Sequence, residues 1–150
     1  GSPGACLSSF GCYRNVGRAE LKGVTLAGRT RFAGVALRGS LDWHDPRNLD
    51  TGLVLQRRAR RLANFGAETT LAGWTLGTEL QAAGVRYEDV ANTQTLGGYA
   101  LVNIFLSKSL TPELALEARI DNLGDRHYEL ARSYATAGRN AQLTLRWSMP

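Results

Sequence analysis

Apolar and polar residues alternate along this chain in segments of about ten residues, a pattern typical of β-strands whose two faces meet different surroundings. The alternation is clear in four segments, which lie at 35–43, 74–82, 114–121 and 140–147. It is weaker in three others, which lie at 16–31, 57–71 and 98–108. In the first of these it slips near Gly23, as a bulge or a glycine kink would cause. The pattern predicts about seven antiparallel strands and an all-β fold.

Hydropathy is compatible with strands that cross a membrane. No apolar run approaches the ~18 to 20 residues that a transmembrane helix needs. Transmembrane strands need only ~9 to 11 residues and alternate apolar with polar side chains, so an average over the chain hides them. The mean hydropathy of -0.22 therefore does not argue against a membrane barrel.

The connections between the predicted strands alternate in length. Three short turns lie at 32–34, 72–73 and 109–112, and three longer polar links lie at 45–56, 88–97 and 124–138. Outer-membrane barrels have short turns at one end and long loops at the other, whereas the turns of a soluble β-sandwich need not segregate by length. Aromatic residues near predicted strand ends suit the interfacial girdles of such a barrel; they are Trp74, Trp147, Tyr87 and Tyr99.

Seven strands do not close a bacterial barrel, which has an even number of strands. Strand edges exposed to lipid are not tolerated, because their backbone groups would lack hydrogen-bond partners. We therefore predict an antiparallel up-and-down transmembrane segment that forms part of a larger barrel. Residues 1–5 have neither the charged nor the apolar region of a signal peptide, so we expect that it has been removed or that the chain begins inside a longer protein.

The chain is basic, with a formal net charge of +5, and its strongest cluster of charge is a run of four arginines: Arg57, Arg58, Arg60 and Arg61. The run has no interleaved aromatic residues and belongs to no nucleic-acid-binding module, so we expect no nucleic-acid partner. At the rim of a barrel these guanidinium groups would face lipopolysaccharide phosphates, and a solvated rim is the alternative.

No catalytic or metal-binding constellation emerges, and we predict neither an enzyme nor a cofactor. His44 and His127 are far apart in sequence and have no nucleophile beside them. Cys6 and Cys12 have no histidine or further cysteine nearby. A disulfide that closes a small exposed loop is the favoured interpretation of this pair, and two free thiols are the alternative.

Four stretches resemble segments of TonB-dependent outer-membrane receptors. Residues 118–129 are similar to the "NLFD..Y" segment at which the penultimate strand enters the last outer loop, and the others lie at 15–24, 55–59 and 136–139. The closest likeness is to vitamin B12 (cobalamin) receptors. The chain departs from the family at Gly124, where Phe is usual, and at Thr25, where Glu is usual. Three residues also follow Trp147, whereas the family normally ends on an aromatic residue.

The resemblance implies that residues 1–150 are the C-terminal part of a receptor barrel in the outer membrane of a Gram-negative bacterium. The plug and the N-terminal strands would lie outside this sequence, and the plug would contact the TonB complex. The implied function is uptake of cobalamin. The alternatives are uptake of a ferric siderophore, a soluble β-sandwich binding module, and a truncated barrel without function.

Alternation and the resemblance together predict three sets of site residues. The side chains expected to face the lumen and the plug are Glu79, Gln81, Asn103, Glu117, Arg119, Asp121 and Arg146. The loop residues expected to bind ligand are Tyr87, Asn92, Tyr128 and Tyr134. The residues expected to contact lipopolysaccharide are Arg57, Arg58, Arg60 and Arg61.

Overall fold

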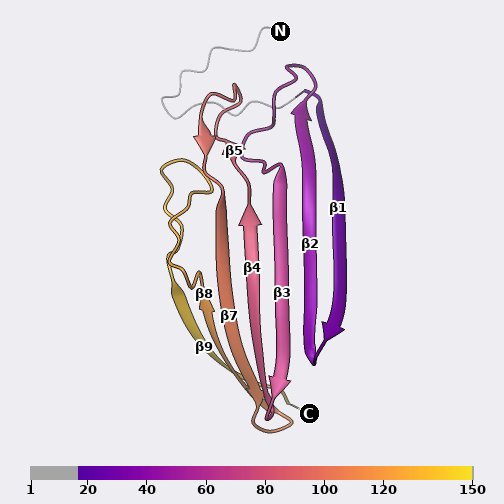
Figure 1. The fold of residues 1–150 in the computed structure, drawn as a ribbon. Helices are drawn as coiled ribbons and strands as arrows, with labels where there is room; N and C mark the ends of the chain where they lie inside the picture. The colour runs from indigo at the N-terminus through magenta and orange to yellow at the C-terminus, as the bar shows by residue number, and fades with distance from the viewer. Residues whose placement is uncertain (1–16, 150) are drawn as a thin grey trace.

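The computed structural model describes residues 17–149, which form one curved sheet of seven antiparallel strands in chain order (Figure 1). The strands are β1 (Ala19–Phe32), β2 (Val35–Asn48), β3 (Arg61–Leu71), β4 (Trp74–Ala83), β7 (Tyr99–Ser109), β8 (Leu114–Asp121) and β9 (Asn140–Trp147). A separate small hairpin pairs β5 (Arg86–Tyr87) with β6 (Thr95–Leu96). The predicted all-β, up-and-down architecture is confirmed.

Two tight turns show why the strands reverse where they do. Ala33 and Gly34 have φ angles of 48° and 80°, and Ala72 and Gly73 have φ angles of 51° and 78°. Two successive residues with positive φ are the signature of the type I′ turn, which matches the twist of a hairpin. With the link at 110–113, these turns define the turn end of the sheet. The long connections 49–60, 84–98 and 122–139 define the opposite, loop end (Figure 1).

Two details of the strands differ from the sequence predictions. The pairing of β1 with β2 is unbroken from Ala19 to Phe32, so the predicted bulge near Gly23 is wrong. The alternation slips there because the loop end of β1 carries a salt bridge between Glu20 and Lys22, 2.9 Å long, on the face that is apolar further down. β2 also continues to Asn48 and β3 begins only at Arg61, so the first loop is shifted toward 49–60.

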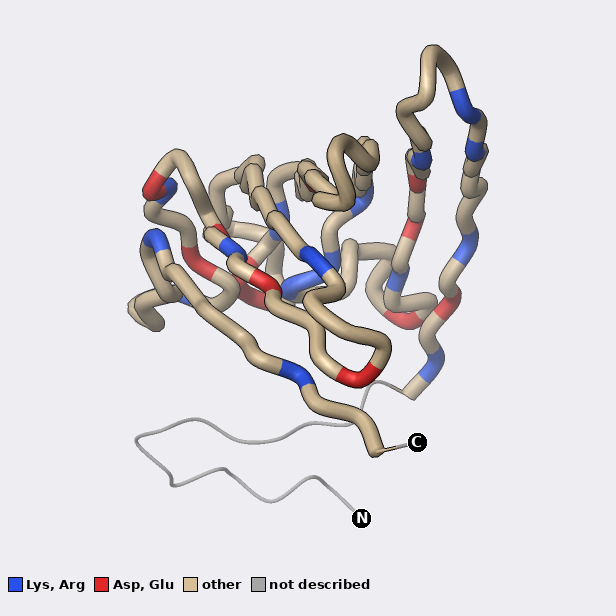
Figure 2. The backbone as a smooth tube through the Cα atoms, turned by 90° about the horizontal axis from the view of Figure 1, so that it is seen from below, with Lys and Arg blue, Asp and Glu red and all other residues tan. Residues whose placement is uncertain are grey.

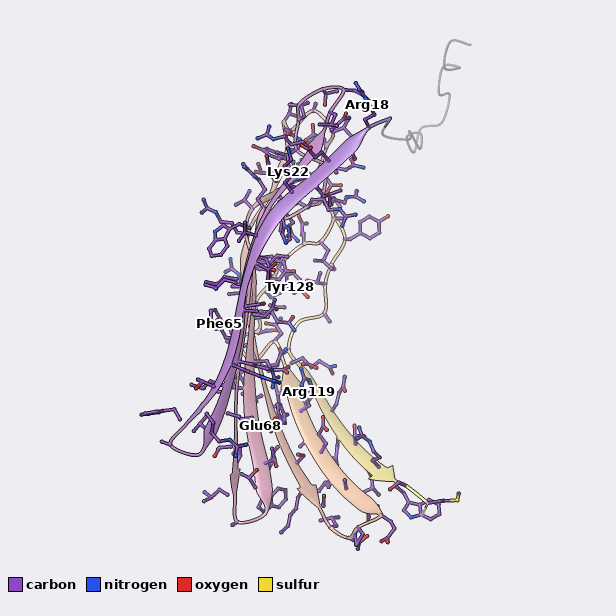
Figure 3. All side chains as sticks on the ribbon, turned by 90° about the vertical axis from the view of Figure 1, so that its right-hand side faces the viewer. Arg18, Lys22, Phe65, Glu68, Arg119 and Tyr128 are labelled. Atoms are coloured by element: carbon purple, nitrogen blue, oxygen red, sulfur yellow. The ribbon has the colours of Figure 1, made fainter. Side chains whose placement is uncertain are left out.

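The two faces of the sheet differ in chemistry. Directly paired residues of neighbouring strands share a face, so the register assigns every side chain to one side. Phe65 lies on the convex side and Arg119 on the concave side (Figure 3). The convex side carries large apolar side chains that are exposed, among them Val24, Leu26, Phe32, Leu71, Leu143 and Leu145. A contiguous exposed apolar surface of this kind marks contact with lipid or with another protein.

The buried core lies at the loop end, where the long loops cover part of the sheet. Its apolar members are Pro46, Val54, Ala83, Leu96 and Leu101. The buried polar members are Arg86, Asn103 and Asn122. The described residues contain no helix long and apolar enough to span a membrane.

Candidate functional site

The three long loops at the loop end dock on one another, and we call residues 49–60, 84–98 and 122–139 the loop cluster. Asn92 ties the first two loops together with a pair of hydrogen bonds. Its Oδ1 accepts from the Val54 N–H at 2.9 Å, and its Nδ2 donates to the Val54 carbonyl at 2.9 Å. The amide of Asn92 is therefore engaged within the protein, although the sequence predicts it as a ligand contact.

Glu88 connects all three loops. Its carboxylate accepts hydrogen bonds from the guanidinium of Arg57, with Nε 3.2 Å from both carboxylate oxygens, and from the backbone N–H of Arg132 at 3.2 Å. The Glu88 side chain is only 14% exposed. Neither Glu88 nor Arg132 could be identified from the sequence, because the hydrogen-bond partners lie 31 and 44 residues apart along the chain.

Arg86 is a buried cation that joins the second and third loops. Its Nη2 donates to the carbonyls of Glu129, at 2.8 Å, and of Gly97, at 3.3 Å. Its guanidinium carbon lies 5.0 Å from the centre of the Tyr99 ring, and that ring lies 4.4 Å from the ring of Tyr128. Tyr128 is thus placed on the concave side by an aromatic and cationic stack (Figure 3).

Two of the tyrosines predicted to form aromatic girdles lie elsewhere in the structure. Tyr99 lies on the concave face, opposite Ala83, so its assignment to an interfacial girdle is wrong. Tyr87 belongs to the small hairpin and not to the seven-stranded sheet. Trp74 and Trp147 do lie on the convex side at the turn end, and the Lys108 ammonium sits 4.9 Å from the Trp74 ring.

Asn122 begins the last loop and shapes it. Its backbone has a positive φ of 50°, and its N–H donates to the Asn103 side chain at 2.9 Å. Its own side chain accepts from the Arg126 N–H at 2.8 Å and donates to the carbonyls of Arg126, at 3.0 Å, and Ala137, at 3.5 Å. Asn122 therefore closes the base of the loop, which also explains why Asn103 is buried.

A network of charges crosses the concave face between β2 and β8. The Glu79 carboxylate accepts from Arg38 Nη2 at 2.7 Å and from Arg119 Nη2 at 2.8 Å. Arg119 also donates from Nε to Asp121 at 2.8 Å. Arg38 reaches Glu79 by lying across Gly66, where a Cβ atom would come within 2.8 Å of its Nε. Glycine in β3 thus lets two non-adjacent strands share an ion pair.

The seven side chains predicted to face the lumen share the concave face, as their cross-strand partners require; they are Glu79, Gln81, Asn103, Glu117, Arg119, Asp121 and Arg146. The structure joins three of them in the network above. Asn103 is committed to Asn122 instead. Their contact with a plug stays a prediction.

All four arginines of the basic run are exposed, and two of them have a carboxylate partner. Arg57 pairs with Glu88 in the loop cluster, and Arg60 lies 3.4 Å from Asp45. Arg58 and Arg61 form no ion pair with any residue of 17–149. Lipopolysaccharide contact stays a prediction, and Arg58 and Arg61 are the two members of the run best placed for it.

The two other tyrosines predicted to bind ligand differ in exposure. Tyr134 projects from the last loop with 72% of its surface exposed, and Tyr87 is half-buried. Cys6 and Cys12 lie outside the described residues. Within residues 17–149, no three His, Cys, Asp or Glu side chains are grouped in a way that could hold a metal ion.

The contacts of Glu88 make the closure of the loop cluster dependent on pH. Hydrogen bonds from Arg57, above all, hold the pKa of the Glu88 carboxyl below its usual range. A lowered pKa in the folded state means that the tie is fully present above the ordinary glutamate pKa and is lost as the pH falls through the lowered value. We expect the loop cluster to stay closed near neutral pH and to open only in acid.

Glu88→Gln should loosen the same tie at neutral pH. We expect amide hydrogen exchange at Arg57 and Arg132 to rise about three- to tenfold, because a charge-assisted contact is lost. Glu117→Gln, on the concave face away from the cluster, is the matched control and should leave exchange in the loops unchanged. An equal response of the two variants would contradict the assignment.

Known proteins share both the sequence pattern and the fold. The family model described as "TonB dependent receptor-like, beta-barrel" matches residues 1–123. The ferric preacinetobactin receptor BauA of Acinetobacter baumannii superposes with a TM-score of 0.72 at 21% identity, over 86% of this chain and 22% of that one.

Two further solved structures give similar values. The copper transporter OprC has a TM-score of 0.76 at 17% identity, over 87% of this chain and 24% of that one. The ferric enterobactin receptor PfeA of Pseudomonas aeruginosa has a TM-score of 0.74 at 19% identity, over 90% and 23%. At these identities the likeness shows the fold alone. The chain spans about a quarter or less of the length of the structures that it matches.

Proposed function

Because the chain belongs to the family of TonB-dependent receptor-like β-barrels of the Gram-negative outer membrane, we propose that it forms part of the wall of a transporter. The observation that carries the proposal is the sheet with an exposed apolar convex face and a charged concave face. Lipid would cover the first face, and the interior of the barrel would lie against the second.

The two edges of the sheet support a larger barrel. β1 and β9 are separated by an even number of antiparallel steps, so both run from the loop end to the turn end. Pairing β1 with β9, either within one chain or between two copies in the same orientation, would therefore give a parallel pair of strands. A closed antiparallel barrel therefore needs an odd number of further strands, and about fifteen would complete a barrel of about 22 strands.

In this proposal the plug, which lies outside residues 1–150, is the part of the receptor that moves. A plug inside the barrel would contact the concave face, including the network around Glu79, and would receive energy through the TonB complex. The ligand would bind above it, on the loop cluster. Tyr134 and Tyr87 are the better placed of the predicted ligand contacts, because Asn92 is engaged with Val54.

Arg58 and Arg61 are candidates for contact with lipopolysaccharide. Arg61 lies directly opposite Trp43, which is exposed on the convex side near the loop end of β2. An indole and a guanidinium at this height suit the boundary between the acyl chains and the phosphate groups.

A ferric siderophore is the first candidate ligand. Two of the similar structures are named as receptors for ferric siderophores, preacinetobactin and enterobactin, and a third is named as a copper transporter. Cobalamin is the second candidate, and the resemblance of residues 15–24, 55–59 and 134–139 to cobalamin receptors is what favours it. Both candidates are large and scarce ligands, and a loop cluster held by many contacts suits either one.

Uptake by the full-length protein tests this proposal. A Gram-negative host without its own siderophore and cobalamin receptors would express the full reading frame and be offered iron-55 siderophores or cobalt-57 cobalamin. We expect uptake of a ferric siderophore, and loss of that uptake when TonB is deleted. Uptake of cobalamin alone would select the second candidate, and no TonB-dependent uptake of any offered ligand would contradict the transport function.

A further inference from the structure

The convex face carries an apolar band in which Lys108 is the one charged side chain. The band consists of the alternate residues of 24–32, 35–43, 63–71, 74–82, 100–108, 114–120 and 141–147. Seen from the turn end, Lys, Arg, Asp and Glu positions are spread over the sheet (Figure 2). The register sends the other charged side chains of the seven strands to the concave face or to the loop end, so Lys108 is exceptional among the described strands.

Lys108 lies at the turn-end boundary of the band. It is the last residue but one of β7, and its ammonium sits 4.9 Å from the centre of the Trp74 ring on β4. Its Cε lies 4.0 Å from the place that a Cβ on Gly73 would take, so the side chain extends toward the tight turn at Ala72 and Gly73. β4 and β7 are each paired on both sides, so no strand outside this sheet is needed to complete the position.

The Lys108 ammonium has no anionic partner within residues 17–149. The other lysine of the sheet, Lys22, pairs with Glu20, whereas no carboxylate of the described residues lies within 4.0 Å of Lys108. The face of the Trp74 ring attracts a cation, but it does not accept the three N–H donors as a phosphate oxygen would. A cation at the edge of an apolar surface therefore matches a ligand with an anionic head and an apolar tail.

We propose that Lys108 and Trp74 hold the phosphate group of a phospholipid in the leaflet at the turn end. The inference rests on the proposed function, because it needs lipid against the convex face. The short turns of an outer-membrane barrel lie on the periplasmic side, where the leaflet consists of phospholipids. The ammonium would donate to the phosphate, and the indole would lie at the height of the headgroups. Leu106 and Leu116, beside Lys108 on the same face, would contact the acyl chains.

Native mass spectrometry of the full-length receptor in detergent tests the site, with dioleoylphosphatidylglycerol as the phospholipid. Lys108→Met removes the charge and keeps an apolar side chain for the lipid side, and Lys108→Arg keeps the charge. Arg146→Met is the matched control, because it removes one cation from the same end of the sheet on the concave face. Heat-modifiability shows that each variant is folded before lipid is added.

We expect Lys108→Met to raise the apparent dissociation constant of the phospholipid about fivefold, since one basic residue beside a lipid surface contributes about that factor. Lys108→Arg and Arg146→Met should change it less than about twofold. Dioleoylglycerol, which has the same acyl chains and no phosphate, should bind all variants equally. Equal binding of the phospholipid to the native receptor and to Lys108→Met would overturn the proposal. An equal loss in Arg146→Met, or an equal loss of dioleoylglycerol binding, would overturn it as well.

Ligand uptake by the unsubstituted receptor separates this inference from the proposed function. A receptor that transports, but binds the phospholipid equally well without the Lys108 ammonium, loses only the lipid site. A receptor that shows the expected difference in lipid binding and does not transport loses only the transport function.

Discussion

Leu80→Arg is expected to prevent most of the protein from assembling in the outer membrane. Leu80 lies in the middle of β4 on the convex face, and its cross-strand neighbours Phe65 and Val102 are apolar. An arginine on the lipid side of a barrel costs roughly 2–4 kcal/mol near the bilayer midplane. That cost falls on the inserted state, so the fraction of receptor that reaches the folded barrel should drop sharply.

Gln81→Arg is the matched control, because it adds the same side chain one residue later on the concave face. The residue directly opposite Gln81 on β3 is Asn64, which is polar. We expect this variant to assemble almost normally. The comparison is read from the fraction of heat-modifiable receptor in isolated outer membranes. Equal assembly of the two variants, or a larger defect at position 81, would contradict the assignment of the convex face to lipid.

The period-two pattern predicted the sheet because each strand separates two different surroundings. β8 and β9 have the bounds expected from the sequence, and β4 extends only one residue beyond its predicted end. The turn at Ala72 and Gly73 delimits the start of β4, since successive positive φ angles cannot continue a strand. The alternation also assigned the predicted lumen residues to one face.

Strand ends near the loops were predicted less well, because the alternation loses its meaning beyond the apolar band. Arg57 was assigned to a strand, yet it has a φ of 57° and belongs to the first loop. Tyr99 was assigned to a girdle from its position near a strand end alone. Counting back four residues from Asn103 would have placed it on the concave face, so the signal was present in the sequence.

The contacts of the loop cluster were beyond reach of a single sequence. Arg57 meets Glu88 across 31 residues, and Arg86 meets the carbonyl of Glu129 across 43. No local periodicity relates such positions, because their proximity follows from how the loops fold over the sheet. The stretch around Asn122 is the exception, since resemblance marked residues 118–129 without revealing why an asparagine stands there.

Asn122→Ala is expected to open the last loop. The change removes three hydrogen bonds of a buried side chain and places alanine at a positive φ. Lost buried hydrogen bonds and the left-handed backbone together should cost roughly 2–4 kcal/mol of local stability. Limited proteolysis of loop 122–139 in the folded receptor measures that loss as faster cleavage.

Asn122→Gly separates the two causes, because glycine accepts the positive φ and still lacks the amide. We expect it to be cleaved faster than the native loop but more slowly than the alanine variant, with a difference of about 1 kcal/mol between the two. Equal cleavage of the native and alanine loops would contradict the closure role of Asn122. Tyr128 and Arg132 belong to this loop, so molecules in which the loop is open lack part of the loop cluster. We therefore expect ligand affinity to fall from the native protein to the glycine variant and further to the alanine variant.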